Sequence, residues 1–275
     1  MELGTTSIII DVMELAAYRR NVFSQYGEDG IIEEIFNRLN ITSGYVCEFG
    51  AWDGKHLSNT YNLYCNNSNF IPILIESDKE KFESLEQNLF NLNKKYIIRK
   101  FLNKEDNHND SLSNILKNFN IKDLDNNNFK LLSIDVDGPD YEIWKNFTDY
   151  SPSVVIIEAS KLVNPEEQIY PTEDGGASAS IIIELAKEKN YELVCHTGSN
   201  CIFVKKELFS KINIKDNSLT NLYIYSQSSA IRRMVKNGIF SNEEGENRIN
   251  AMSSRGEVIE YAETFSPLVY FPGRF

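Results

Sequence analysis

Tyr45-Val-Cys-Glu-Phe-Gly-Ala-Trp-Asp-Gly54 begins as an apolar run and ends in a loop with two glycines. The run predicts a buried strand, and Glu48 stands directly ahead of the loop. A buried strand that leads through a glycine loop into a helix opens a nucleotide-binding βαβ unit. Gly50 and Gly54 are spaced G-x-x-x-G, so the G-x-G-x-x-G fingerprint of dinucleotide-binding proteins is missing. The stretch therefore predicts an α/β fold with a ligand at this loop and disfavours a bound pyrophosphate.

The next strand also ends in an acid. After the loop, residues 56–64 predict a helix, in which Ser58 or Asn59 either caps the first turn or contacts a ligand. Residues 70–75 are apolar and lead into Glu76-Ser77-Asp78. An acid at the carboxyl end of a buried parallel strand is placed to accept both hydroxyls of a ribose. We expect Glu76, with Ser77 beside it, to contact a cofactor ribose; the alternative is an acid that caps the helix predicted for residues 79–92.

The third strand is predicted over residues 96–102 and is followed by a polar loop, residues 103–110. In this type of fold the loop after the third strand commonly holds adenine. Glu105 and Asp106 are therefore candidates for adenine contacts, and a solvated loop is the alternative.

A central strand, residues 131–134, ends in a cluster of acids around Gly138-Pro139. These acids are Asp135, Asp137 and Asp140, and carboxylates this close repel one another unless a cation, a proton or water separates them. One of them could take a proton from an acceptor hydroxyl, or a pair could hold a divalent cation. The alternative is a purely structural turn with Asp140 as the helix N-cap. It explains Asp140 well but explains Asp135 and Asp137 poorly.

The last strands predict a change of direction in the sheet. Residues 153–158 form a fifth strand that ends in Glu158, and the long loop 159–174 that follows is predicted to act as a lid or an acceptor-binding loop. Residues 191–195 and 201–205 are joined so closely that they predict an antiparallel hairpin. His196 and Asn200 lie in its turn, where His196 is either a catalytic base or a polar turn residue.

The N-terminal segment adds a second group of polar side chains. Residues 11–20 and 31–39 predict helices, and Glu28 or Asp29 is expected to cap the second one. Capping does not explain Gln25 and Tyr26 in the preceding loop, so a cofactor-binding role stays open for both.

Composition limits the classes of partner. The chain has 275 residues with 41% apolar residues and a formal net charge of −12, which argues against nucleic acid and anionic membranes. Its four cysteines form no C-x-x-C pair, and no apolar run is long enough to cross a membrane. We expect a cytoplasmic protein with N-terminal helices over residues 1–40, a ligand-binding core over 41–210, and an extension over 211–275 that caps the site or forms a homodimer contact.

Taken together, six motifs resemble the FkbM-type S-adenosylmethionine (SAM)-dependent methyltransferases. The motifs are Ser24-Gln-Tyr-Gly-Glu-Asp-Gly30, Glu48-Phe-Gly-Ala-Trp-Asp-Gly54, Ile75-Glu-Ser-Asp78, Ser133-Ile-Asp-Val-Asp-Gly138, Ile157-Glu158 and Gly198-Ser-Asn200. The resemblance spans about residues 20–205. It implies a Rossmann-like class I methyltransferase fold: a mostly parallel seven-stranded sheet with a final antiparallel hairpin and helices on both faces.

The same resemblance implies roles for individual residues. Glu48, Gly50, Asp53 and Gly54 would frame the methionine part of SAM, and Glu76 would hold its ribose. Asp135 and Asp137 would face the transferred methyl group. Macrolide-sugar O-methyltransferases with a similar acidic segment use magnesium, so a magnesium ion on Asp137 and Glu158 is a further expectation.

The sequence thus predicts a SAM-dependent O-methyltransferase for a sugar or sugar-nucleotide hydroxyl, in the biosynthesis of a bacterial surface polysaccharide such as capsule or lipopolysaccharide. Asp137 is the first candidate for the base, with Asp135 and His196 after it. Two alternatives stay open. One is a non-catalytic scaffold that binds SAM or a glycan; the other is a nicotinamide-dependent oxidoreductase, against which the missing fingerprint and the hairpin argue.

Overall fold

The computed structural model describes most of the first 222 residues and short parts of the remainder. The described residues are 15–101, 104, 110–119, 121–136, 138–160, 163, 165–172, 176–222, 224–226, 241, 243, 260–264 and 266–270. The predicted adenine contacts Glu105 and Asp106 and the predicted base Asp137 lie outside them.

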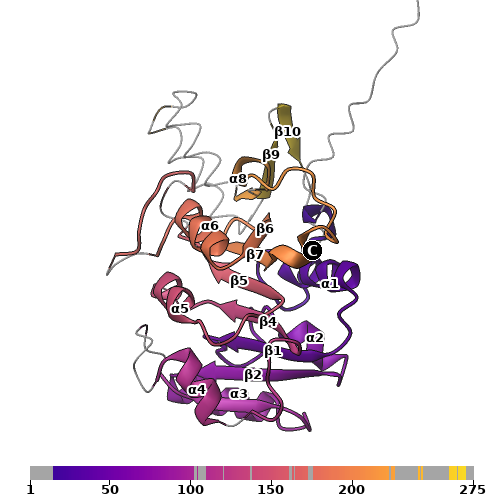
Figure 1. Cartoon of the computed structure of the whole chain (residues 1–275), viewed down its shortest axis with the longest axis vertical. Coiled ribbons are helices and arrows are strands. Elements are labelled where there is room, and N and C mark those ends of the chain that lie inside the picture. Colours follow the sequence, from indigo (N-terminus) through magenta and orange to yellow (C-terminus); the bar gives the residue numbers. More distant parts are fainter. Residues whose placement is uncertain are drawn as a thin grey trace, which may run out of the picture.

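A seven-stranded sheet forms the centre of the molecule (Figure 1). Its strands are β1 (Gly44–Phe49), β2 (Phe70–Glu76), β3 (Tyr96–Arg99), β4 (Phe129–Ile134), β5 (Val154–Glu158), β6 (Tyr191–His196) and β7 (Asn200–Lys205). They lie in the order β3-β2-β1-β4-β5-β7-β6. The first five are parallel, and β7 runs antiparallel to both β5 and β6. This arrangement confirms the predicted Rossmann-like methyltransferase fold with its final reversed strand.

Helices cover both faces of this sheet. One face carries α1 (Glu28–Leu39), α2 (Tyr61–Cys65) and α3 (Lys79–Asn88), and the other carries α4 (Leu112–Asn118), α5 (Asp140–Asn146) and α6 (Ala179–Glu188). Figure 1 shows α5 and α6 to the left of the strands and α1 and α2 to the right. Side chains of β1 alternate between the two hydrophobic clusters, with Val46 on one face and Cys47 on the other.

The remaining described elements are short. They are the 3₁₀ helix η1 (Ala16–Tyr18), α7 (Lys206–Phe209), α8 (Leu219–Leu222), and the strands β8 (Ile224–Ser226), β9 (Glu260–Thr264) and β10 (Ser266–Tyr270). The last three form an antiparallel sheet of their own. α1 packs into the same apolar cluster as the central sheet. The division at residues 40 and 210 stays a prediction.

Several helices differ from their predicted extent. The helix predicted for residues 79–92 ends at Asn88, and of residues 15–20, the described part of the helix predicted for 11–20, only Ala16–Tyr18 is helical, as η1. The helix predicted for residues 56–64 is limited to Tyr61–Cys65, and α1 begins three residues earlier than expected, at Glu28. The late start of α2 follows from the hydrogen bonds of Glu48 described below. Within the described part of the chain, the helices are too short or too polar to cross a bilayer.

Candidate functional site

The carboxyl ends of four parallel strands place the predicted site residues on one edge of the sheet. Glu48 pairs with Ser133 and Phe49 pairs with Ile134, so the glycine loop after β1 adjoins the chain that leaves β4. Glu76 ends β2 and Glu158 ends β5 on the same edge. In open α/β sheets the ligand lies at this edge, where the strand order reverses between β1 and β4.

The two glycines of the loop are required by close approaches within the protein. Gly50 has φ +72°, and a Cβ there would lie 1.9 Å from the carbonyl oxygen of Asp135. Gly54 has φ +75°, and its Cβ would lie 2.3 Å from a methyl carbon of Leu85 in α3. A side chain at either position would therefore displace β4 or α3. The two glycines let the loop pack closely against the sheet and α3. Close approach of the loop to a ligand would be a second use of them.

Glu48 is buried and holds the segment that precedes α2. Its carboxylate accepts hydrogen bonds from the Ser58 hydroxyl (2.6 Å), the Asn59 N–H (2.8 Å) and the Thr60 hydroxyl (2.7 Å). Ser58 in turn accepts from the N–H of Tyr61, the first residue of α2. Burial raises the pKa of the Glu48 carboxyl, and the hydrogen bonds oppose that shift. Because Glu48 fixes these residues in an irregular segment, the helix starts later than predicted.

Glu76 connects the glycine loop to the chain after β2. One carboxylate oxygen accepts the N–H of Trp52 at 2.8 Å, and the other accepts the N–H groups of Ser77 and Asp78, each at 2.8 Å. A carboxylate has about four acceptor positions, so these bonds leave one for a further donor. The alternative role of Glu76 as a helix cap is excluded, since Asp78 is the N-cap of α3. Contact with a ribose stays a prediction for Glu76 and Ser77.

Asp53 and Asn59 also bond to protein groups. Asp53 accepts the N–H groups of Lys55 and His56 at 2.9 and 2.7 Å, which closes a turn in the loop. The amide of Asn59 donates to the hydroxyl of Ser133 in β4 at 3.2 Å, in the buried interior. Both side chains thus stabilise the protein's own structure, and direct contact with a cofactor stays a prediction for each.

Trp52 was not predicted as a site residue. Its backbone has φ +48°, which is rare outside glycine, and its side chain is 44% exposed. The Nζ of Lys81 lies 4.2 Å from the centre of its ring, within the range of a cation–π interaction. A large aromatic residue between two glycines of a ligand loop is the sequence signal that could have identified it.

Asp140 has a different role from the predicted N-cap. The N-cap of α5 is Pro139, and the Asp140 carboxylate instead accepts the N–H groups of Val136 and Gly138, each at 2.9 Å. Burial raises the pKa of Asp140 to about 6, and the charge of Glu158 adds to the shift. The alternative of a turn is therefore confirmed for Asp140, but its placement as the N-cap is wrong, because its side chain bonds to the turn after β4.

The other acids of this edge are less enclosed. Asp135 is half-buried at the end of β4, and Glu158 is half-buried and accepts the Ser199 hydroxyl at 3.3 Å. Over the described ranges, no three His, Cys, Asp or Glu side chains lie close enough together to hold a metal ion. Magnesium on Asp137 and Glu158 stays a prediction, since Asp137 lies outside those ranges.

Glu28 joins the start of α1 to the hairpin between β6 and β7. Its carboxylate accepts the Thr197 hydroxyl at 2.8 Å, the Asn200 side-chain amide at 2.9 Å and the Tyr26 N–H at 2.7 Å. Glu28 and Asp29 lie in the first turn of α1, near its N-terminus as predicted, but the N-cap is Gly27, which has no side-chain hydrogen bond. Sequence reasoning missed the link to Thr197, because 169 residues separate the partners and no local pattern marks it.

The residues ahead of α1 form a tight loop around the second acid. One carboxylate oxygen of Asp29 accepts three successive N–H groups at 2.7 to 2.8 Å, from Val22, Phe23 and Ser24. Arg19 donates to the carbonyl oxygen of Tyr26 at 2.9 and 2.6 Å. Gln25 is exposed and Tyr26 is half-buried. A cofactor contact stays a prediction for Gln25 and Tyr26.

His196 is the last residue of β6 and is 1% exposed. Its Nδ1 accepts the N–H of Gly198 at 2.9 Å, which places the imidazole inside the hairpin turn. Burial lowers the pKa of His196 to about 3, so the ring is neutral near pH 7 but weakly basic. This geometry suits a polar residue that stabilises the turn better than it suits a catalytic base.

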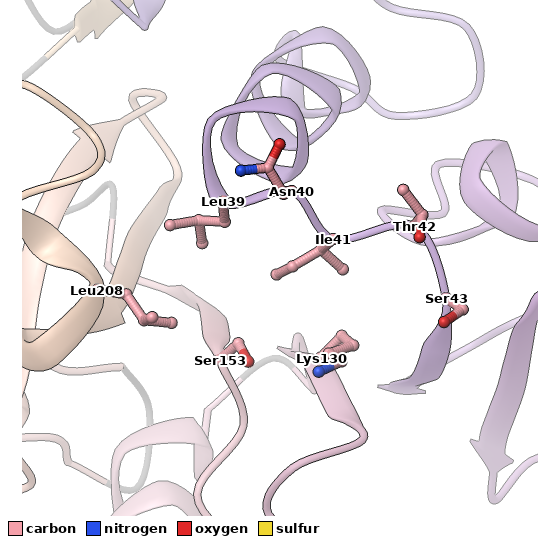
Figure 2. Close-up of a pocket in the computed structure, with 8 residues that line it drawn as sticks. All are labelled: Leu39, Asn40, Ile41, Thr42, Ser43, Lys130, Ser153 and Leu208. Carbon is pink, nitrogen blue, oxygen red and sulfur yellow. The ribbon is translucent and has the colours of Figure 1, made fainter.

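A pocket of 230 Å³ lies on the opposite edge of the sheet. Figure 2 shows the side chains that line it, which come from the end of α1, the chain before β1, the second residue of β4, the residue before β5, and α7: Leu39, Asn40, Ile41, Thr42, Ser43, Lys130, Ser153 and Leu208. The amino ends of the parallel strands meet here, so this pocket is separate from the candidate site.

Comparisons with known proteins identify structural similarity alone. No protein-family model and no curated protein sequence matches the chain. Among solved structures, it is similar to a proposed caffeoyl-CoA O-methyltransferase from Staphylococcus aureus, with 14% identity, a TM-score of 0.42, and 67% of this chain and 85% of that chain covered. It is also similar to TrmK from M. capricolum in complex with S-adenosylhomocysteine, with 14% identity, a TM-score of 0.42, and 80% and 95% covered.

A third similar structure is a precorrin-6y C5,15-methyltransferase from Geobacter metallireducens, with 12% identity, a TM-score of 0.39, and 67% of this chain and 90% of that chain covered. With identities and TM-scores this low, the fold assignment rests on the strand order above.

Proposed function

We propose that the protein is a SAM-dependent O-methyltransferase that acts on a hydroxyl of a sugar or sugar nucleotide. The observation that carries the proposal is the position of the Glu76 carboxylate, at the end of β2 and bonded to the glycine loop through the Trp52 N–H. This is where the fold places the acid that binds a nucleoside ribose. The strand order with its reversed β7 and the motif resemblance to FkbM-type methyltransferases agree with it.

The residues of this edge suit SAM in charge and in hydrogen-bonding capacity. The Glu76 carboxylate keeps an acceptor position for a ribose hydroxyl, and the loop from Gly50 to Gly54 would lie along the methionine part. Asp29, near Glu48, keeps a buried acceptor atom without a partner among the described residues. SAM supplies an electrophilic methyl group on a sulfonium.

The protein's task is then to align the acceptor oxygen with that methyl group, an effect that can contribute roughly 7–11 kcal/mol. We assign Asp137 as the base or metal ligand for the acceptor hydroxyl, with Asp135 as the second candidate. Asp140 is unsuited, because both its oxygens hold the turn. The long loop after β5 would face the acceptor, since it leaves the same edge. The sugar acceptor, a role in surface polysaccharide synthesis and a cytoplasmic location follow from the motif resemblance.

Replacing Asp137 by Ala tests the assigned base. We expect turnover of an identified acceptor to fall by at least about a hundredfold, because general bases contribute on the order of 10²–10⁴. Calorimetry should show affinity for S-adenosylhomocysteine within a few-fold of the unchanged protein.

The companion variant is His196→Asn, whose side-chain oxygen can replace the Nδ1 acceptor. If Asp137 is the base, His196→Asn retains most of its turnover. Normal turnover by Asp137→Ala, or a loss confined to His196→Asn, would reject the assignment of Asp137.

A further inference from the structure

Two buried oxygen atoms, in the first turn of α1 and at the start of β7, have no hydrogen-bond donor among the described residues. They are Oδ1 of Asp29 and Oδ1 of Asn200, in residues that are 1% and 4% exposed. A buried acceptor without a donor costs about 1–3 kcal/mol, and more when the group is charged. Such atoms persist in a folded protein where another molecule supplies the donor.

The two atoms belong to one hydrogen-bonded cluster. The Asn200 amide donates to Glu28, and Asp29 is the next residue of the same helix turn. The other oxygen of Asp29 is fixed by three backbone N–H groups, so the carboxylate cannot turn away from its position. The free atom of Asp29 is therefore held in place before any ligand arrives.

The cluster adjoins the end of β1. The charge of Asp29 acts on Glu48, which is the acid directly ahead of the glycine loop. Asn200 pairs with Glu158 at the end of β5. Both orphan acceptors are thus at the edge where the candidate cofactor lies, on its α1 side.

The charge balance indicates a cation. Glu28, Asp29 and Glu48 are each no more than 5% exposed. Arg19 interacts electrostatically with Glu28 and offsets part of this charge. Buried carboxylates are stable where a cation compensates them. This cation is unlike a metal ion, because the described residues contain no group of three His, Cys, Asp or Glu side chains that could hold one.

We propose that Asp29, with Asn200, binds the α-ammonium group of the amino-acid part of SAM. This inference rests on the proposed function. Of the two cationic groups in SAM, the sulfonium has no hydrogen to donate, whereas the ammonium has three N–H donors. An ammonium has enough N–H donors for both orphan oxygens and would add positive charge to the cluster that contains Glu28. The loop before α1 and the turn between β6 and β7 would then both serve to bind this ammonium group.

The test compares ligands with and without the ammonium by calorimetry. The ligands are S-adenosylhomocysteine, its analogue with a hydroxyl in place of the α-amino group, and 5′-methylthioadenosine, which lacks the amino-acid part. In Asp29→Asn the amide oxygen can accept the same N–H groups, while its NH₂ faces the ligand. We expect this variant to bind S-adenosylhomocysteine roughly ten- to a hundredfold more weakly. Its affinity for the other two ligands should stay within about twofold of the unchanged protein's, because neither ligand carries the ammonium.

Asn200→Ala is the second variant, in case Asp29→Asn fails to fold, and it should show a smaller loss for the same ligand only. Asp125→Asn, the same change in an exposed turn at the amino edge of the sheet, is the control and should alter nothing. Unchanged affinity of Asp29→Asn, or equal losses for all three ligands, would overturn the inference while leaving the proposed function intact. Failure of the unchanged protein to bind any of the three would overturn both.

Discussion

Glu48, Glu76 and Asp140 share a structural task at the ligand edge of the sheet. Each residue is no more than 6% exposed and accepts hydrogen bonds from a neighbouring loop or turn. Bonds from N–H groups to a carboxylate are stronger than those between neutral groups, so these acids fix the loop positions. Glu48 and Glu76, which are expected to contact ligand, thus also shape the surface on which a ligand would lie, and Asp140 shapes it without such a contact.

Asp140 gives a prediction for the dependence of stability on pH. Its pKa is about 6 in the folded protein, raised by burial from an ordinary value of 3.8. As pH rises from 4.5 to 7, the unfolded chain releases this proton before the folded protein does, so the free energy of unfolding falls. The contribution of this residue to that fall is about 2 kcal/mol.

Urea unfolding at the two pH values measures the effect. Asp140→Asn should lose less stability than the unchanged protein over this interval. Asp125 serves as the contrast. Backbone N–H groups lower its pKa, so its own contribution to the free energy of unfolding increases with pH, and Asp125→Asn removes that increase. An identical pH dependence for Asp140→Asn and the unchanged protein would contradict the burial assigned to this carboxyl.

At the scale of elements, the glycine loop after β1 is shaped by its contacts with β4 and α3. Gly50 and Gly54 meet Asp135 and Leu85, while Glu76 and Glu48 hold the intervening and following residues. The loop is therefore part of the packed core on one side and a candidate ligand surface on the other.

Gly50→Ala tests this description. The added Cβ would lie 1.9 Å from the Asp135 carbonyl oxygen, on a backbone with φ +72°. Both effects oppose the folded state, and we expect the free energy of unfolding to fall by roughly 3 kcal/mol or more. Gly176→Ala is the matched control, because its nearest neighbouring atoms would be 3.9 Å away. It should change stability by no more than about 0.5 kcal/mol. Equal effects of the two changes, measured by urea unfolding, would refute the close approach.

The sequence predicted most elements but not the bonds between their ends. Apolar runs that close in Glu48, Glu76 and Glu158 identified three central strands, since burial on both faces leaves a local pattern. The start of α2 was misplaced, because Ser58 bonds to Glu48 on another element. The link between Glu28 and Asn200 spans 172 residues, and no local pattern could indicate it.

At the scale of the whole molecule, strand order places the acids. Because β1, β2, β4 and β5 run in one direction, their carboxyl ends bring Glu48, Glu76 and Glu158 to a common edge. The reversed β7 then brings Asn200 beside Glu158 at that edge. The formal net charge of −12 agrees with a cationic ligand and disfavours polyanionic partners.

The central claim is that this edge binds a SAM-type nucleoside, and calorimetric titration with S-adenosylhomocysteine tests it most directly. NADH serves as the comparison ligand, and both titrations are repeated with magnesium. The account predicts micromolar affinity for S-adenosylhomocysteine and no binding of NADH, because the G-x-G-x-x-G cradle for a pyrophosphate is missing. Folded protein that binds NADH, or that fails to bind S-adenosylhomocysteine under either condition, would contradict it.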